Sequence, residues 1–348
     1  MRWSGMTAAI YLLSATFAYA QERGLPAAID FPTASVAETR SLEFHVAPAT
    51  AGSLDAQVRA ALRELARRNR NAALVKLRVF AVGAAALDSS RLAIARALAH
   101  TNAPLPVLSL VGAAGFPDTT QLVEIESTAA GGHALNPQGV GFIAGVASPA
   151  GDRTVAGLAR VAREAGIPSA NVLRISCFYE RADQVAPARA AIATAFPTAE
   201  ASFVFSYAAS SAPAIECEAV ARLAAAPATP RQYFNLPEVP ASPNYAHAAL
   251  VATRTVVFAD AGMALDATDS SMHAMLERTK TAVARYGASL SSVVMGDNYW
   301  LTDAARDTLR LVRTQYFGGT VPAATGVFFT SLASEGASAA LELVVAIE

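Results

Sequence analysis

The sequence predicts an α+β protein made of three similar units in one chain. A β-branched strand, a short amphipathic helix and a later strand with a glutamate occur in this order three times, within residues 74–127, 172–219 and 293–346. A fixed order of elements at a nearly constant interval is typical of repeated structural units. Strands with helices on one side favour a two-layer unit with a mixed sheet. Three such units can close around a pseudo-threefold axis, so the clefts between them are candidate sites.

The first two units each open with a strand and a helix. Residues 41–47 have a strand pattern, and residues 55–70 have the spacing of a long helix. In the second unit a glycine-rich strand is expected at residues 139–147. A helix follows at about residues 155–165 and ends at Gly166 and Pro168, which together form a normal helix-stop signal.

The third unit follows a proline-rich connector at residues 224–243. Its opening strand is expected at residues 249–262 and its first helix at residues 271–286, ahead of the repeated phrase. Each unit therefore has the predicted order β-β-α-β-α-β. The sheet face without helices would be apolar and would need a partner. The next unit in the same chain can supply that partner.

Composition limits the possible classes of function. The chain has 348 residues, of which 53% are hydrophobic and 16% charged, with a formal net charge of −1. This length and composition provide material for three cores and for large buried interfaces between them. Without a basic stripe, nucleic acid is not expected as a partner. We expect a monomer, because the three units can bury one another's apolar sheet faces.

The N-terminus has the pattern of a secretory signal peptide at residues 1–20. Arg2 supplies the charged region, residues 6–17 are a short apolar core, and Ala18 and Ala20 form an A-x-A cleavage site. The apolar run is too short for a membrane span, and no later segment is expected to cross a membrane. The predicted localisation is therefore periplasmic or secreted.

Cys177 and Cys217 are the only cysteines, and both fall on predicted strands of the middle unit. In an oxidising compartment such a pair can form a disulfide. The alternative is two small buried side chains that do not meet. We favour the second, because neighbouring strands do not guarantee facing side chains.

The third unit resembles the RidA (YjgF) family of enamine/imine deaminases, which have a chorismate-mutase-like fold. The segments PNYAHAALVATRTVVFADAG, YGASLSSVVMGDNYWLTD, QYFGGTVPAATGV and LELVVAI carry the resemblance. The other two units resemble the family more weakly, through the endings VEIES and IECEA. The RidA-like units are expected at residues 38–128, 132–223 and 244–348. Because RidA proteins are homotrimers with ligand clefts between subunits, the resemblance implies an intramolecular pseudotrimer.

An arginine that the family uses is absent here. The family's P-A-R-[ST] motif supplies a guanidinium that pairs with the substrate carboxylate, a task suited to its planar fork. The resemblance aligns Ala324, Ala201 and Pro106 with that position. Standard imino-acid deamination therefore lacks its carboxylate anchor in all three clefts.

Two kinds of family residue are retained. The late-strand glutamate, which orients or activates water in the family, is matched to Glu124, Glu216 and Glu342, and the cleft tyrosine is matched to Tyr245. A glutamate in a partly apolar cleft can have a raised pKa and act as an acid or base. The alternative is a glutamate solvated at the rim or paired with an arginine. Glu126 and Glu218 face the same way by strand period and could pair across unit interfaces.

Three helical arginines could replace the missing anchor. Arg91, Arg189 and Arg310 fall at the same position of the second helix in each unit. The alternative, which we favour, is that they are surface residues of an amphipathic helix. The five histidines have no metal-ligand spacing, so no metal site and no cofactor are expected.

The sequence therefore predicts a RidA-like protein that acts on or binds a small imine, enamine or carboxylate in a cleft between units. A hydrolase or deaminase-like enzyme is favoured, because glutamates are retained. A non-catalytic periplasmic binding or interaction protein is the alternative, because the arginines are absent. A chorismatase-like hydrolase or lyase is a third reading, since that family also packs several such units into one chain.

Overall fold

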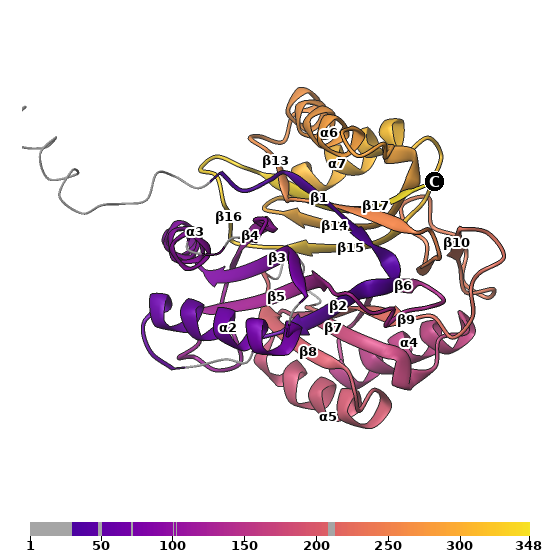
Figure 1. Ribbon diagram of the computed structural model, residues 1–348, viewed down its shortest axis with the longest axis horizontal. Helices are drawn as coiled ribbons and strands as arrows, with labels where there is room; N and C mark the ends of the chain where they lie inside the picture. The colour runs from indigo at the N-terminus through magenta and orange to yellow at the C-terminus, as the bar shows by residue number, and fades with distance from the viewer. Residues whose placement is uncertain (1–29, 48–50, 71, 100, 102, 208–212) are drawn as a thin grey trace, which may run out of the picture.

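The computed structural model describes residues 30–47, 51–70, 72–99, 101, 103–207 and 213–348. Within these ranges the chain forms three mixed β-sheets around a common centre, and each sheet carries two helices on its outer face (Figure 1). No helix in this part of the chain is both long and apolar enough to span a membrane. The predicted leader lies outside the described residues and stays a prediction.

The first sheet has the strand order β16-β4-β3-β5-β2. Its main elements are β2 (Leu42–Val46), α2 (Leu54–Asn69), β3 (Ala73–Val82), α3 (Ala84–Leu98), β4 (Val107–Ala113) and β5 (Val123–Ala130). Helix α2 begins where the Ser53 hydroxyl accepts a hydrogen bond from the amide of Ala56, as an N-cap does. The helix predicted at residues 55–70 is confirmed to within one residue.

The second sheet has the order β10-β11-β6-β9-β7-β8. Its elements are β6 (Val140–Ser148), α4 (Gly151–Glu164), β7 (Val172–Tyr179), α5 (Val185–Ala195), β8 (Glu200–Phe205), β9 (Ile215–Arg222), β10 (Arg231–Phe234) and β11 (Ala248–Val251). Strand β10 lies inside the proline-rich connector and pairs with β11. Both strands extend the second sheet, although β11 lies within the predicted third unit.

The third sheet has the order β1-β12-β17-β14-β15, with β13 also paired to β17. Its elements are β1 (Ala34–Glu38), β12 (Thr255–Ala259), β13 (Gly262–Ala264), α6 (Asp269–Ala284), β14 (Val293–Trp300), α7 (Asp303–Tyr316), β15 (Ala323–Phe328) and β17 (Ala339–Ile347). The short strand β16 (Ser331–Leu332) leaves this sheet and pairs with β4 of the first. The domain boundaries given above stay a prediction, since strands cross them in both directions.

Two expectations about the strands are wrong. The order β-β-α-β-α-β lacks the strand that directly follows the second helix of each unit, where β4, β8 and β15 run parallel to β3, β7 and β14. A helix that returns the chain to a parallel neighbour is the usual β-α-β connection. The single strand expected at residues 249–262 is divided into β11, β12 and β13, because the chain turns between Val251 and Thr255 and changes sheets.

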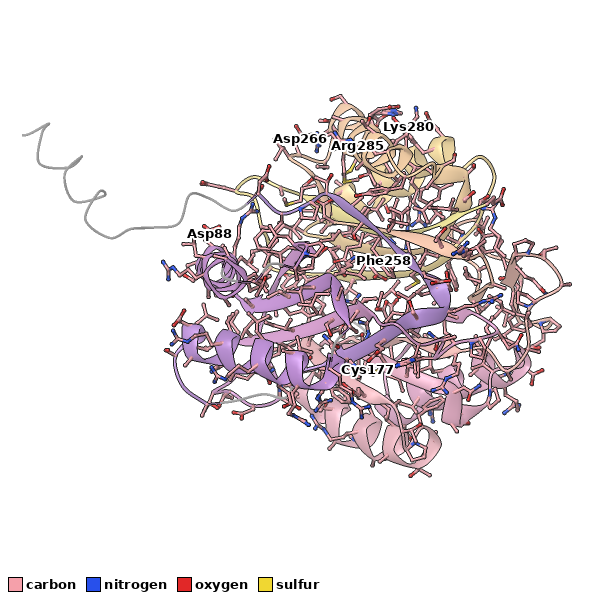
Figure 2. The ribbon with its side chains drawn as sticks, viewed as in Figure 1. Asp88, Cys177, Phe258, Asp266, Lys280 and Arg285 are labelled. Carbon is pink, nitrogen blue, oxygen red and sulfur yellow. A yellow bond between two sulfur atoms is a disulfide. The ribbon has the colours of Figure 1, made fainter. Side chains whose placement is uncertain are left out.

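The apolar residues form two kinds of core. Each sheet packs its outer face against its own pair of helices. The inner faces meet one another, and side chains from all three sheets, such as Phe44, Phe142 and Phe258, form a shared central cluster. Figure 2 shows Phe258 between the layers and Asp88, Asp266, Lys280 and Arg285 on the outside. The expectation that the bare sheet faces bury one another is confirmed.

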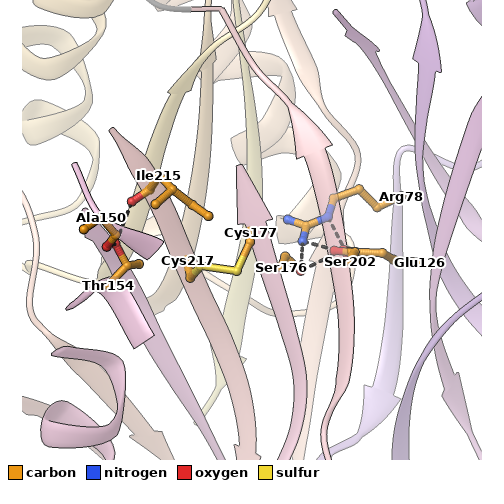
Figure 3. The surroundings of a disulfide bond; sticks show 9 residues. All are labelled: Arg78, Glu126, Ala150, Thr154, Ser176, Cys177, Ser202, Ile215 and Cys217. Atoms are coloured by element: carbon orange, nitrogen blue, oxygen red, sulfur yellow. Dashed lines mark hydrogen bonds and ion pairs between the residues drawn. A yellow bond between two sulfur atoms is a disulfide. The ribbon is translucent and has the colours of Figure 1, made fainter. Parts of the chain in front are cut away.

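The preference for two separate cysteines is wrong. Cys177 on β7 lies directly opposite Cys217 on β9, and the two are joined in a disulfide that is fully buried. The disulfide lies on the side of β7 that faces α4 and α5. Figure 3 shows it on the opposite side of the strand from Arg78 and Ser176, as expected for consecutive strand residues.

Candidate functional site

A β-bulge in the same place of each sheet aligns the three units residue by residue. The register of β3 against β5 shifts at Val75, that of β7 against β9 shifts at Leu173, and that of β14 against β17 shifts at Val294. Counted from the bulge, Arg78, Ser176 and Asp297 are equivalent, and the residues opposite them are Glu126, Glu218 and Glu342.

The predicted equivalence of Glu342 with Glu124 and Glu216 is wrong by two residues. Glu124 and Glu216 lie opposite Phe80 and Phe178, and in the third sheet that position opposite Tyr299 belongs to Ala340. Glu342 is instead 2% exposed, and its Oε2 lies 2.7 Å from Nζ of Lys76 in a central ion pair. Glu124 and Glu216 therefore line clefts between sheets, whereas Glu342 lines the small central cavity.

The position that the resemblance assigns to an arginine is apolar in every sheet. Ser109, Ser202 and Thr325 lie beside the three equivalent residues Arg78, Ser176 and Asp297. The residue before each is Leu108, Ala201 or Ala324. Leu108 thus replaces Pro106 in the alignment, because the parallel strand begins two residues later than expected.

The Glu216 cleft lies between the second and third sheets, beside edge strand β15, and has a volume of about 300 Å³. Its polar and aromatic lining comes from β9, β14, β15, α7 and the loop before β11, and consists of Glu216, Asn244, Tyr245, Asn298, Trp300, Arg310, Arg313 and Thr325. The loop is held in place because the amide of Ala246 donates to the carbonyl of Pro322, 2.8 Å away. Three of the predicted residues, Glu216, Tyr245 and Arg310, are brought together here.

Glu216 is positioned at the junction of the two sheets. Its Oε1 accepts a hydrogen bond from the amide of Gly326 at 3.2 Å and packs against Gly145, where a side chain would collide with it. Burial raises the pKa of Glu216 to about 7, and the carboxylates of Glu218 and Glu180 add to the rise. A carboxyl group with this pKa can both accept and donate a proton near neutral pH.

Arg310 and Trp300 form one wall of the Glu216 cleft. The guanidinium carbon of Arg310 lies 5.4 Å from the centre of the Trp300 ring, within the range of a cation–π contact. The Trp300 ring fills the space above Gly326, where any Cβ would lie within 2.1 Å of the indole. Arg310 itself is exposed at the mouth of the cleft.

Arg313 lies deeper in the same cleft and is 4% exposed. Its Nη1 donates to Oδ1 of Asn298 at 2.9 Å, and its Nη2 donates to the carbonyl of Asn244 at 2.7 Å. Burial lowers the pKa of Arg313 to about 10, and the neighbouring Arg310 contributes. Arg313 therefore remains cationic at neutral pH.

The Glu124 cleft lies between the first and second sheets, beside edge strand β8, and has a volume of about 400 Å³. Its polar lining comprises Arg68, Asp118, Gln121, Glu124, Arg189 and Glu200. Burial raises the pKa of Glu124 to about 8, although Nε2 of Gln121 donates to its Oε2 at 3.0 Å. Arg189 is stacked 4.8 Å from the ring centre of Phe203. Glu124 and Arg189 are thus also brought together.

The equivalent place between the third and first sheets differs from the other two. Ala340 replaces the glutamate, and the outer edge of β4 is paired with β16 through Ser331 and Leu332. Arg91 lies over the ring of Phe31 from the N-terminal segment, 5.8 Å from its centre. Arg91 is therefore not brought together with any of the predicted glutamates.

A buried charged cluster joins the three sheets at their centre. The guanidinium of Arg78 donates to Glu126 at 2.8 Å, to Glu218 at 2.7 Å and to Asp297 at 2.9 Å, one carboxylate from each sheet. Burial and the nearby Glu218 raise the pKa of Asp297 well above its usual range. The expectation that Glu218 pairs across an interface is confirmed, and Glu126 is bonded in the same cluster. No group of His, Cys, Asp and Glu in the described ranges is arranged to hold a metal ion.

Sequence reasoning missed Asn244, Asn298, Trp300 and Arg313 as lining residues. Arg313 follows Arg310 by one helical turn, and this spacing was a usable signal. Asn298 and Trp300 lie on a strand whose residues are all buried, so their place in the cleft became visible only once α7 and β15 were packed beside them.

Comparisons with known proteins found similar solved structures for about a third of the chain. No family model matches the sequence, and no curated protein matches it. A solved member of the YjgF/YER057c/UK114 family from Mycobacterium tuberculosis is 20% identical and covers 34% of this chain and 99% of its own, with a TM-score of 0.25. A Rid-family protein of unknown function from Yersinia pestis is 16% identical and covers 34% of this chain and 100% of its own, with a TM-score of 0.31.

Proposed function

We propose that this chain is a covalent pseudotrimer of three RidA-like units that hydrolyses a small imine or enamine carboxylate in the Glu216 cleft. The observation that carries the proposal is a carboxyl group with a pKa of about 7 in an open cavity that also contains Tyr245 and two arginines. A glutamate poised near neutral pH suits proton transfer. The helical arginines suit binding of a carboxylate where the strand arginine of the RidA family is absent.

The reaction needs one group that first accepts and then donates a proton. Ionised Glu216 takes a proton from water as the water oxygen bonds to the imine carbon. Protonated Glu216 then returns this proton to the nitrogen, which gives a carbinolamine. Glu216 next takes the proton of the new hydroxyl group and passes it to the nitrogen as the carbon–oxygen double bond forms and the carbon–nitrogen bond breaks, so ammonia leaves a 2-oxo acid behind. Arg310 holds the substrate carboxylate, and its stacking on Trp300 restricts the guanidinium to one side of the cleft.

Removal of a leader and export belong to the same proposal. The pattern at residues 1–20 supports export. The buried disulfide is also in keeping with an oxidising compartment. The proposed localisation is therefore periplasmic or secreted, with a small metabolite as the ligand.

The test is the hydrolysis of 2-iminopropionate, generated in place by an amino-acid oxidase, by the purified protein and its Glu216→Gln and Glu124→Gln variants. We expect Glu216→Gln to lower the rate at least about 100-fold, the usual contribution of a general acid–base group. Glu124→Gln is the matched control from the sibling cleft and should retain most of the rate. Loss of activity in the control alone would move the proposal to the Glu124 cleft.

A non-catalytic binding protein is the second candidate, and the apolar residues Leu108, Ala201 and Ala324 at the arginine position favour it. The same assay separates the two candidates. If the wild-type protein does not accelerate hydrolysis at all, imine hydrolysis is wrong and the binding function replaces it.

A further inference from the structure

Arg313 occupies a core position that is apolar in the other two units. The buried residues of α7 are Ala305, Leu309, Val312 and Arg313, which together form one face of the helix. The alignment from the bulge makes Ile94 of α3 and Ile192 of α5 equivalent to Arg313, and both isoleucines are buried. Helix–sheet packing in this fold therefore does not require an arginine at this position.

The residue that accepts a hydrogen bond from Arg313 also differs between the three sheets. Asn298, which accepts its hydrogen bond, is equivalent to Cys177 in the second sheet and to Val79 in the first. In the third sheet a polar pair thus replaces apolar or disulfide-bonded core residues. Such a pair is costly to bury, because both groups lose their contact with water. Its presence beside an open cavity points to a ligand.

The charge of Arg313 has no compensating carboxylate. Both of its acceptors, Asn298 Oδ1 and the Asn244 carbonyl, are neutral, and no ion pair to Arg313 is found within the described ranges. A guanidinium has five N–H donors, so these two bonds leave others for a ligand in the cavity that Arg313 lines. A buried cation without a counter-ion is strongly unfavourable unless a bound anion supplies one.

A second positive charge lies on the same helix face. Arg310 is one turn before Arg313 and lines the same cavity at its mouth. The single acidic side chain among the cavity's lining residues is Glu216, whose burial favours its neutral form. The cleft is therefore a cavity of about 300 Å³ with two cations and at most one anion.

We propose that the Glu216 cleft binds a small dianion, with one anionic group held by Arg313 at the back and the second by Arg310 at the mouth. A short dicarboxylate and a phosphate monoester share this chemistry. The inference rests on the proposed function for the use of this cleft and adds the charge of the ligand. It goes beyond a single carboxylate, because one anionic group would leave one of the two guanidinium groups unpaired.

The Glu124 cleft provides an internal comparison within the same chain. Arg189 is equivalent to Arg310, but Ile192 stands in place of Arg313, and Asp118 and Glu200 add negative charge to the lining. A second arginine, Arg68, also lines the Glu124 cleft, but it is paired with Glu64 and Glu200, so this cleft has no second uncompensated cation. The full chain should bind one dianion, not two.

The test is isothermal titration calorimetry of the full chain with succinate and with monomethyl succinate, which has nearly the same shape and one charge fewer. Methyl phosphate is the second dianion. Comparing its affinity with that of succinate shows whether the cleft prefers a phosphate monoester or a dicarboxylate. The variants are Arg313→Ile, which copies the equivalent residue of the other units and should fold, and Arg189→Met as the matched control. Thermal melts verify that each variant is folded.

We expect a dianion to bind with a stoichiometry of one and more tightly than monomethyl succinate. Arg313→Ile should weaken dianion binding at least about 30-fold, as removal of a buried charge partner does, and should leave monomethyl succinate nearly unchanged. Arg189→Met should have no effect. Equal binding of the succinate pair, no binding of either dianion, or an unchanged preference in Arg313→Ile would overturn the inference. Imine hydrolysis by the wild-type protein would still stand in each of these cases, so the two failures are distinguishable.

Discussion

Two glutamates that are neighbours on one strand can have opposite protonation states in this protein. Glu124 is buried without a cation in hydrogen-bonding contact, and burial raises its pKa to about 8. Glu126, two residues on, accepts from Arg78 and from Ser176 and Ser202, and these contacts together with Arg174 lower its pKa to about 2 despite burial. The chemistry of each carboxyl group is therefore set by its partners and not by its depth.

A consequence at the residue scale is that Glu124 makes folding depend on pH. Between its ordinary pKa of 4.5 and about 8, the folded protein holds a proton that the unfolded chain has lost, so stability falls as pH rises through this window. Glu124→Gln should remove this contribution. The free energy of unfolding should then fall less between pH 5 and pH 8 than in the wild type, by about 2 kcal/mol or more, since one pKa unit corresponds to about 1.4 kcal/mol.

Urea unfolding at both pH values measures the effect. Comparing wild type with variant cancels the other titrating groups, provided that they lie far from the change. Glu277→Gln, on an exposed helix face, is the control and should leave the pH dependence unchanged. An identical pH dependence in wild type and Glu124→Gln would contradict the raised pKa.

At the scale of elements, helix α7 illustrates what the sequence could and could not predict. The common position of Arg91, Arg189 and Arg310 was visible in the sequence, and two of the three do reach a cleft. Arg313 was not identified, because its importance depends on the isoleucines at the equivalent positions. The match of Arg91, Arg189 and Arg310 already placed Ile94 and Ile192 at the position of Arg313, but only the structure shows that Arg313 lines a cavity and bonds to Asn298.

The pairing of β7 with β9 is covalently fixed by the Cys177–Cys217 disulfide. Replacing both cysteines by alanine should lower the free energy of unfolding by about 2–4 kcal/mol, the usual effect of losing a disulfide. Equilibrium urea unfolding with and without dithiothreitol measures it. The reductant should destabilise the wild type by a similar amount and leave the double variant unchanged. Insensitivity of the wild type to the reductant would contradict a disulfide in solution.

At the scale of the whole molecule, strands exchanged between sheets hold the three layers together. Strand β1 precedes the first sheet in sequence but pairs with β12 of the third, and β11 precedes the third sheet but pairs with β6 of the second. The amide of Asn136, ahead of the second sheet, donates to the carbonyl of Arg40, ahead of the first. Each opening segment thus contacts the preceding unit in a consistent direction around the centre (Figure 1).

Arg78 contacts a carboxylate from each of the three sheets. Arg78→Met should destabilise the protein by about 3–5 kcal/mol, because it leaves three buried carboxyl groups without their cation. Arg160→Met is the control, since Arg160 pairs with Glu238 on the surface and such pairs contribute about 0–1 kcal/mol. Denaturant unfolding of both variants measures the difference. Equal stability of the two variants would contradict the central role of Arg78.

The repeated phrase was enough to predict mixed α/β layers with helices on one face of each sheet and buried inner faces. It was not enough to place the opening strands, because a strand's pattern shows which residues are buried and not which sheet it joins. The extra parallel strands β4, β8 and β15 were missed for a related reason. None of the three shows the regular alternation of a half-buried strand: β4 is buried along its whole length, and β8 and β15 are only 6 residues long.

The central claim is that the Glu216 cleft is catalytically active and that the carboxyl group of Glu216 transfers the proton. The pH dependence of 2-iminopropionate hydrolysis tests this claim most directly. The groups that face Glu216 are Glu218, Glu180 and Arg310, and the pKa of its carboxyl is about 7. We expect the rates of the wild type and of Glu124→Gln to change through an ionisation near pH 7, and we expect this ionisation to vanish in Glu216→Gln together with most of the rate. An ionisation near pH 7 that persists in Glu216→Gln with the rate intact would contradict the claim.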